Sequence, residues 1–232
     1  MNLADLRAQL DANQAWRRDE LRHLQNYAAQ LPNEDEEAGL LRPLVLLLYA
    51  HFEGYCKFAL VLYVDTINAA KIKCGEANFV IAAAALDDIF ELLRNSGKLS
   101  SIFRNILPDD SQLHTLARSH EFLERLSEFE SFTVNISDKY ISMQSNLTPS
   151  VLQKNLYKLG LPHSLFSSYE PKINMLLNYR NKIAHGEHQT LSKAEYERLR
   201  QATFDIMDGV TLQIYKALQE KWYLRANSSG SS

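Results

Sequence analysis

Cysteine, glycine and proline are all scarce in this sequence of 232 residues, which contains two cysteines, eight glycines and six prolines. Cys56 and Cys74 show no pairing pattern and the N-terminus shows no secretion signal, so we expect a reducing, cytoplasmic setting. The prolines stand mostly where helical patterns begin or end. Internal repeats, glycine-rich phosphate loops and long heptad runs are also missing, and the sequence predicts an all-α fold.

Positive charge is not in excess either. The formal net charge is −3 and the isoelectric point is about 6.2, whereas many nucleic-acid-binding domains are basic. No global positive field attracts nucleic acid, so any RNA binding has to occur locally, in a cleft.

A convincing set of metal ligands is missing as well. His185 and His188 are three residues apart, but the helix that carries His185 is expected to end at Gly186. No second ligand pair of the kind that zinc prefers is present. We therefore expect no metal and no other cofactor, and we interpret His51 as a residue at the edge of the core.

The longest apolar stretch, Leu44 to Val64, has about 20 residues, which is the length of a membrane span. His51, Glu53 and Lys57 interrupt its middle, and three ionisable groups would be costly in lipid. We therefore expect no membrane and interpret the stretch as the central helix of a soluble bundle. Glu53 would lie on a partly buried face of this helix and would need a positively charged partner.

The remaining patterns organise the chain around this helix. An amphipathic helix is expected over residues 3–31 and a break over 32–37, which together predict an N-terminal helix and linker over 1–37. A helical domain over 38–225 follows. The serine-rich end predicts a flexible tail over 226–232. Thr148 and Pro149 start a short helix that ends at Gly160, and Ser192 with Glu195 caps a final helix. Further helices are expected at 77–95, 111–131, 171–185 and 193–223, with a loop over 133–147.

The segment from Leu176 to Gly186, LLNYRNKIAHG, holds the most informative residues. Helical spacing places His185 at the C-terminus of a helix, where the last carbonyls favour an imidazolium and make acid–base work possible. At 100° per residue, His185 shares one polar stripe with three asparagines on the same helix, Asn174, Asn178 and Asn181.

Arg180 lies instead on the apolar face of this helix, beside Ile173, Leu177 and Ala184. An arginine there has to meet a carboxylate or lie in an interface, because burying it unpaired would be very costly. The simplest expectation is an ion pair between Arg180 and Glu53.

These residues carry a family resemblance. Arg180, Asn181 and His185, in RNKIAH, resemble the R-N-x-x-x-H form of the signature of the HEPN superfamily (higher eukaryotes and prokaryotes nucleotide-binding domains). Glu53 and Lys57, in FEGYCK, resemble the family's E-x-x-x-K pair. Residues 146–162 are similar to the HEPN branch associated with RiboL-PSP operons, and the resemblance covers roughly residues 38–222.

The resemblance implies a HEPN-type helical bundle with an N-terminal helical extension, which forms a homodimer with facing motifs. Many such proteins are metal-independent ribonucleases that act as toxins or in defence against phage, so we expect RNA as the substrate, 2′,3′-cyclic phosphate ends, and an antitoxin or defence-system partner protein. His185 would act in acid–base catalysis, Arg180 would stabilise phosphate charge, and Asn181 would orient the histidine or the substrate. Supporting roles fall to Glu53, Lys57 and Asn178, and phosphate contacts to Lys172 and Lys182.

Several alternatives stay open. The chain could be a non-catalytic HEPN module that binds nucleotide or docks a partner protein, whereas a plain helical structural domain would leave Arg180 unexplained. His185 could simply be hydrogen-bonded to its own helix end, and the asparagines could form a solvated face. Toxins neutralised by a partner nucleotidyltransferase carry a tyrosine two residues after the motif histidine. Glu187 occupies that position here, which argues against such a modification.

Overall fold

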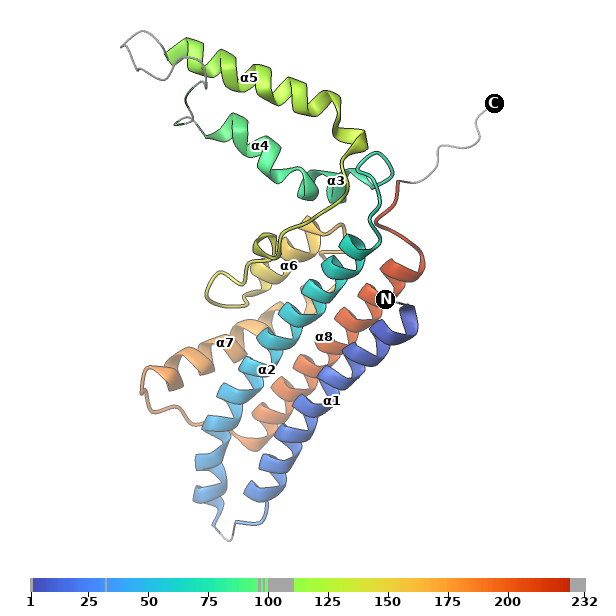
Figure 1. Ribbon diagram of the computed structural model, residues 1–232. Coiled ribbons are helices and arrows are strands. Elements are labelled where there is room, and N and C mark those ends of the chain that lie inside the picture. Colours follow the sequence, from blue (N-terminus) through green and yellow to red (C-terminus); the bar gives the residue numbers. More distant parts are fainter. Residues whose placement is uncertain (1, 32, 96, 98, 100–110, 226–232) are drawn as a thin grey trace. The chain divides into compact units, whose positions relative to one another are not determined.

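A computed structural model describes residues 2–31, 33–95, 97, 99 and 111–225 of the chain. Among the described residues, the chain divides into two compact units, one formed by residues up to 66 and by 141–221, and the other by 67–140 and the residues from 222 onward. Apart from two isolated bridges, the described residues form helices, turns and loops (Figure 1). The predicted all-α fold is confirmed.

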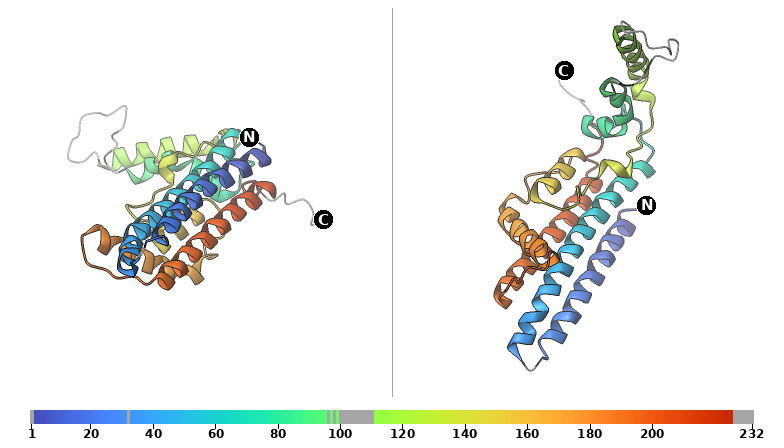
Figure 2. Two further views of the ribbon diagram at one scale, coloured as in Figure 1. Left: turned by 90° about the horizontal axis from the view of Figure 1, so that it is seen from below. Right: turned by 90° about the vertical axis from the view of Figure 1, so that its left-hand side faces the viewer.

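The first unit is a helical bundle. Its elements are α1 (Leu3–Ala28), most of α2 (Glu34–Ala69), α6 (Pro149–Lys158), the short 3-10 helix η3 (Ser167–Tyr169), α7 (Glu170–Ala184) and α8 (Lys193–Gln219). The long helices α1, α2 and α8 run side by side in each view of Figures 1 and 2, and α7 packs on α8 and α6. Apolar side chains from four helices fill the core between them, including Leu6, Leu10, Leu21, Leu48, Phe52, Leu60, Ile173, Leu176, Met207, Val210 and Ile214.

Local signals set the ends of two of these helices as expected. The Thr148 side chain accepts a hydrogen bond from the Val151 N–H and Pro149 follows in the first turn of α6. Ser192 and Glu195 form a reciprocal capping box at the start of α8. The last helix is shorter than predicted: it ends at Gln219 rather than near Tyr223, because the chain turns into the left-handed region at Lys221, with φ 55°.

The apolar helix α2 lies inside the bundle. Residues 38–69 form a helix that is long and apolar enough to cross a membrane by length and composition alone. However, 56% of its apolar 18-residue stretch is buried inside the protein. The Tyr55 hydroxyl hydrogen-bonds the Thr211 hydroxyl of α8, and both side chains are buried. These contacts fit a central helix, and the absence of a membrane stays an expectation.

The N-terminal helix is part of the same bundle. α1 packs along α8, where Gln14 Nε2 and Arg18 Nη2 each lie 2.7 Å from the same Asp208 carboxylate oxygen. The predicted boundary at residue 37 does not coincide with a division between the compact units, and the division into domains stays a prediction. The expected tail over 226–232 lies outside the described residues.

The second unit contains α3 (Phe79–Ala85), α4 (Asp87–Arg94), α5 (Ser111–Ser127) and two 3-10 helices, η1 (Phe129–Ser131) and η2 (Asp138–Tyr140). The single helix expected over 77–95 is wrong, because Leu86, with φ −99° and ψ 12°, separates α3 from α4. The helix expected over 111–131 ends at Ser127. Residues 133–147 are mostly loop, with η2 and a single bridge at Thr133.

Candidate functional site

The site begins at the C-terminus of α7, where the helix stops as the sequence predicts. His185 is the last, capping residue, and Gly186 follows with φ +79°, a conformation that favours glycine. The Gly186 N–H donates to the Ile183 carbonyl and the Glu187 N–H donates to the Lys182 carbonyl, over 3.1 and 2.9 Å. This double closure is the Schellman motif, and it fixes the direction in which the chain leaves the histidine.

The imidazole of His185 is exposed and available. Its backbone N–H donates to the Asn181 carbonyl over 3.0 Å, but its ring makes no hydrogen bond to any residue that the structure describes. A histidine that only caps its own helix would bond the terminal carbonyls. The geometry therefore leaves the ring free to meet a substrate or a second chain.

Arg180, by contrast, is held in place. Its guanidinium carbon lies 4.7 Å from the centre of the Tyr49 ring of α2, and Nη1 donates to Asn181 Oδ1 over 2.7 Å. Stacking on an aromatic face is a typical way to keep a half-buried arginine ordered. The Asn181 amide thus orients the arginine, rather than the histidine that the sequence suggested as one alternative.

Tyr49 is itself fixed by Glu53 and by the loop before α6. Its hydroxyl donates to Glu53 Oε2 over 2.7 Å, and the Leu147 N–H lies 2.7 Å from the Tyr49 oxygen and 3.1 Å from Glu53 Oε2. Burial raises the pKa of Tyr49, and the hydrogen bond to Glu53 raises that pKa further. Tyr49 is therefore a neutral phenol that holds its ring under the guanidinium.

The expected ion pair between Glu53 and Arg180 is not made within this chain. Among the described residues no salt bridge joins these two groups, and none joins Glu53 to the exposed Lys57. Two hydrogen-bond donors, the Tyr49 hydroxyl and the Leu147 N–H, satisfy the Glu53 carboxylate instead of a cation. Tyr49 stands between the two groups: its hydroxyl bonds the Glu53 carboxylate and its ring stacks under the Arg180 guanidinium.

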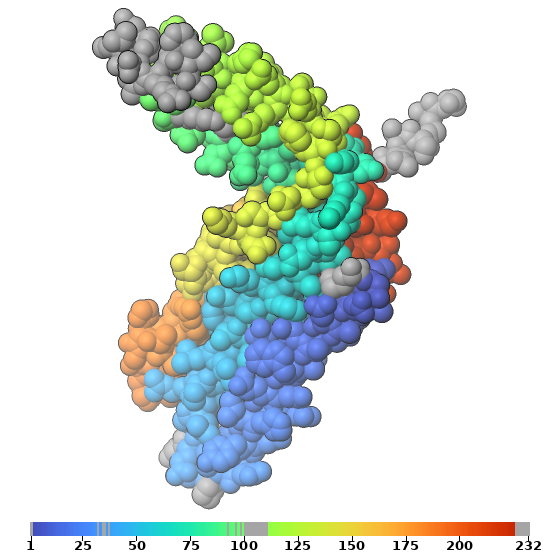
Figure 3. All heavy atoms as spheres, viewed as in Figure 1, coloured from blue at the N-terminus to red at the C-terminus, as the bar shows by residue number. Residues whose placement is uncertain are grey.

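Sequence reasoning missed two residues of α2 that contact the motif. One is Tyr49, and the other is Arg42, whose Nη2 donates to the Glu187 carbonyl just after the motif, over 3.0 Å. Figure 3 shows α7 and the following segment, in orange, against the light-blue part of α2. Arg42, Tyr49 and Glu53 are separated by seven and four residues, so helical periodicity alone places all three on one face.

The polar stripe of α7 borders an open hollow of about 320 Å³. The lining residues come from α7 and from the segment after it: Pro171, Asn174, Met175, Asn178, Tyr179, Lys182 and Gln189. Two of the residues predicted to form the site, Asn178 and Lys182, are therefore brought together here. Lys172 is not among them: it lies in the first turn of α7, with its ammonium 5.7 Å from the centre of the Tyr169 ring.

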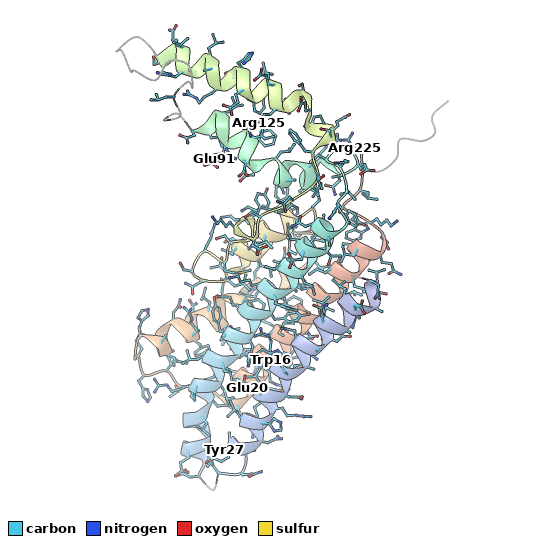
Figure 4. The ribbon with its side chains drawn as sticks, viewed as in Figure 1. Trp16, Glu20, Tyr27, Glu91, Arg125 and Arg225 are labelled. Atoms are coloured by element: carbon cyan, nitrogen blue, oxygen red, sulfur yellow. The ribbon has the colours of Figure 1, made fainter. Side chains whose placement is uncertain are left out.

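His51 is more deeply buried than the edge of a core, with 4% of its surface exposed. Nε2 lies 2.9 Å from a Glu20 carboxylate oxygen of α1, and Nδ1 lies 3.3 Å from Arg17 Nη1. Trp16 packs edge-on against the imidazole, with the two ring centres 5.2 Å apart. Figure 4 shows Trp16 and Glu20 on the side of α1 next to α2. Burial lowers the pKa of His51, and the Arg17 cation lowers it further, whereas Glu20 opposes the shift.

No group of three or more His, Cys, Asp or Glu side chains within the described part of the chain is arranged to hold a metal ion. The His185 and His188 pair therefore has no third ligand of these types among those residues.

Comparison with known proteins identifies the family. The model of the MAE_28990-like HEPN family matches residues 6–223, and this range includes most of α1 as well as the motif helix. No curated protein and no solved structure gives a significant match. The match does not confirm the RiboL-PSP-associated branch that residues 146–162 suggested. Because the model spans nearly the whole described chain, the protein belongs to the HEPN superfamily.

Proposed function

We propose that the protein is a metal-independent endoribonuclease whose active site is built on the C-terminal half of α7. One observation carries the proposal. The same helix presents an exposed, unbonded imidazole at His185 and, five residues earlier, a guanidinium held by a ring and an amide. The stack on Tyr49 and the bond to Asn181 can stabilise the fold, but they do not account for a free imidazole on the same helix, whereas phosphate chemistry uses both groups.

RNA supplies its own nucleophile. The 2′-hydroxyl attacks the adjacent phosphorus while its proton passes to a base, and the bond from phosphorus to the 5′-oxygen breaks as that oxygen takes up a proton. The products are a 2′,3′-cyclic phosphate and a 5′-hydroxyl. In this proposal His185 transfers the protons, and Arg180 stabilises the negative charge that develops on the phosphate oxygens.

Two copies of the chain complete the site. Five residues of helix turn the side-chain directions of Arg180 and His185 apart by about 140°, so the two groups of one chain diverge. A symmetric dimer with both α7 ends near its axis lets the arginine of one chain and the histidine of the other approach the same phosphate. It also supplies two histidines, one to accept a proton and one to donate it.

The divergence of Arg180 and His185 also favours a second candidate. If the two groups never approach one phosphate, the protein is a non-catalytic HEPN module that binds nucleotide or docks a partner protein through the same helix. For the nuclease we propose a cytoplasmic role in toxicity or antiphage defence, controlled by a partner protein. If the chain is the non-catalytic module instead, the partner protein would carry the toxic or defensive activity.

Digestion of total RNA by the purified protein separates the two candidates. We expect cleavage that survives excess EDTA and leaves 2′,3′-cyclic phosphate ends, with a dimer by light scattering. A strict requirement for magnesium would contradict the mechanism, and a stable monomer that still cleaves RNA would contradict the dimer. Intact RNA with retained nucleotide binding would favour the non-catalytic module.

A further inference from the structure

We propose that the hollow on α7 is a subsite for an unpaired adenine next to the scissile phosphate. This inference rests on the proposed ribonuclease function and names the base that the same site selects.

The amides of Asn174 and Asn178 are available to a ligand. Both side chains are exposed, both line the hollow, and neither makes a hydrogen bond to any residue that the structure describes. Asparagine is a poor helix former, and within helices it is usually tolerated where its amide bonds nearby backbone. These two asparagines lower helix propensity without any such local bond, so a hydrogen bond to a ligand accounts for their presence.

An aromatic ring and a third amide complete the lining. The hydroxyl of Tyr179 interacts with Glu195 of the α8 capping box; burial raises the pKa of Tyr179, and the nearby carboxylate raises it further. Its ring is thus anchored at one end, and Tyr179 and Met175 both line the hollow. Gln189 enters from the segment after the helix, with its Nε2 3.3 Å from the His188 carbonyl. A rigid ring flanked by amides is how proteins hold an unstacked base.

The hollow lies next to the proposed chemistry. Lys182 lines it and stands one helical turn before His185. At 1.5 Å per residue, Asn178 precedes His185 by about 10 Å along the axis and lies on the same side of the helix. A short stretch of single strand spans this distance, so a base in the hollow would place a neighbouring phosphate near Lys182 and the imidazole.

The chemistry of the lining favours adenine. A side-chain amide offers one donor and one acceptor side by side, which matches the acceptor N7 and the donor N6 of adenine. The volume of about 320 Å³ is at the lower end of the range for ligand pockets, large enough for a base. None of the described lining residues carries a carboxylate, so the hollow offers no counter-charge to a basic peptide.

End-sequencing of cleaved RNA tests the subsite. The wild-type protein should cut next to adenine in preference to other bases. The double variant Asn174→Ala and Asn178→Ala should reduce cutting next to adenine about tenfold relative to cutting next to other bases, since one bidentate pair discriminates by this order. The matched control is Gln219→Ala, an exposed amide in the last turn of α8, and it should keep the wild-type preference.

A binding measurement separates recognition from cleavage. With His185→Ala protein, short oligoadenylate should bind more tightly than oligouridylate, and the two asparagine substitutions should remove the difference. If the wild-type protein cleaves RNA without a preference for adenine, or with a preference that the asparagine variants leave unchanged, the subsite is wrong while the nuclease proposal stands. A protein partner would then be the occupant to consider. If the wild-type protein leaves RNA intact, the proposed function itself fails.

Discussion

The two faces of α7 differ in whether their polar side chains find partners within the protein. On the face toward α2, Arg180 lies over Tyr49 and bonds Asn181. On the polar stripe, Asn178 and His185 are exposed and make no side-chain hydrogen bond to the described residues. One face is organised before any substrate arrives, and the other keeps its hydrogen-bonding capacity for a ligand.

This difference matters for catalysis because preorganised charge stabilises a transition state more effectively than mobile charge. The guanidinium does not have to be ordered when the phosphate binds, since an aromatic ring and an amide hold it already. The imidazole has to move protons, and a ring without fixed partners can reorient between donor and acceptor positions. Substitutions on the polar stripe, the open face with Asn178 and His185, should therefore change activity alone. Substitutions on the face toward α2, the held face with Arg180, should change stability as well.

The largest effect is expected at His185. His185→Ala should lower the rate of RNA cleavage by about 10²–10⁴-fold, the usual contribution of a general acid or base. Because the ring is exposed and unbonded, the melting temperature and the helical circular dichroism should stay native. His188→Ala, another exposed histidine three residues further on, serves as the control and should keep full activity. Equal losses in the two variants would remove the special role of His185.

Tyr49 should be the most sensitive position for stability. Tyr49→Ala removes a side chain that is 3% exposed and should lower the free energy of unfolding by about 3–5 kcal/mol. Tyr49→Phe removes only the hydroxyl and leaves Glu53 a donor in the Leu147 N–H, so about 1 kcal/mol is expected. Urea unfolding measures both.

The same pair of variants tests the stacking. Cleavage should persist in Tyr49→Phe, which keeps the ring under Arg180, and should fall in Tyr49→Ala at temperatures where the variant is still folded. If folded Tyr49→Ala cleaves RNA as fast as the wild type, the ring has no role in positioning the guanidinium.

Double-mutant cycles rank the contacts of the held face. The structure predicts a larger coupling between Tyr49 and Arg180 than between Glu53 and Arg180, because the first two stack and the last two are joined only through the ring. Cation–π coupling of about 0.5–2 kcal/mol is expected for the stacked pair. A Glu53–Arg180 coupling as large as the 3–5 kcal/mol typical of a broken buried ion pair would show that the two charges meet directly.

The end of α7 and the start of α8 were predictable from the sequence because they depend on local residues. Gly186 supplies the left-handed conformation that stops α7, and Ser192 with Glu195 caps α8 by bonds three residues apart. The break at Leu86 lies in a run without glycine or proline, so no helix-breaking residue predicts it.

The partner of Glu53 shows the limit of periodicity. A helical repeat tells which residues of α2 share a face, and it would have grouped Arg42, Tyr49 and Glu53. It does not tell which residue of another helix crosses that face, or that a tyrosine would stand between two charges. The expectation of an ion pair came from the physical need of Glu53 for a partner, and in this protein a hydroxyl and a backbone N–H meet that need.

Two histidines of the bundle, His185 and His51, differ in the same way as the two faces of α7. His185 is exposed, whereas His51 is enclosed by α1, with the Glu20 carboxylate at one ring nitrogen and Arg17 at the other. The Cβ of any residue larger than glycine at position 54 would lie 2.9 Å from Arg17 Nη1, so Gly54 gives the arginine room beside the histidine. The carboxylate is half exposed, and solvent screens its attraction for a proton. Burial and the Arg17 cation therefore dominate, and the pKa of His51 is lower in the folded protein than in the unfolded chain.

The smallest expected effect is a pH dependence of stability. Above about pH 6.5, the usual pKa of histidine, His51 is neutral in both the folded and the unfolded protein and does not contribute to the pH dependence. As the pH falls below this value, the unfolded chain binds a proton that the folded protein still refuses, so the free energy of unfolding decreases by at most about 1.4 kcal/mol per pH unit. Urea unfolding of the wild type at pH 7.5 and 5.5 should show this loss, and His51→Gln should reduce it, because carboxylates titrate mainly at lower pH. If the wild type gained stability on acidification over this range and His51→Gln abolished the gain, the Glu20 carboxylate would dominate, and the buried histidine would be the protonated member of an ion pair.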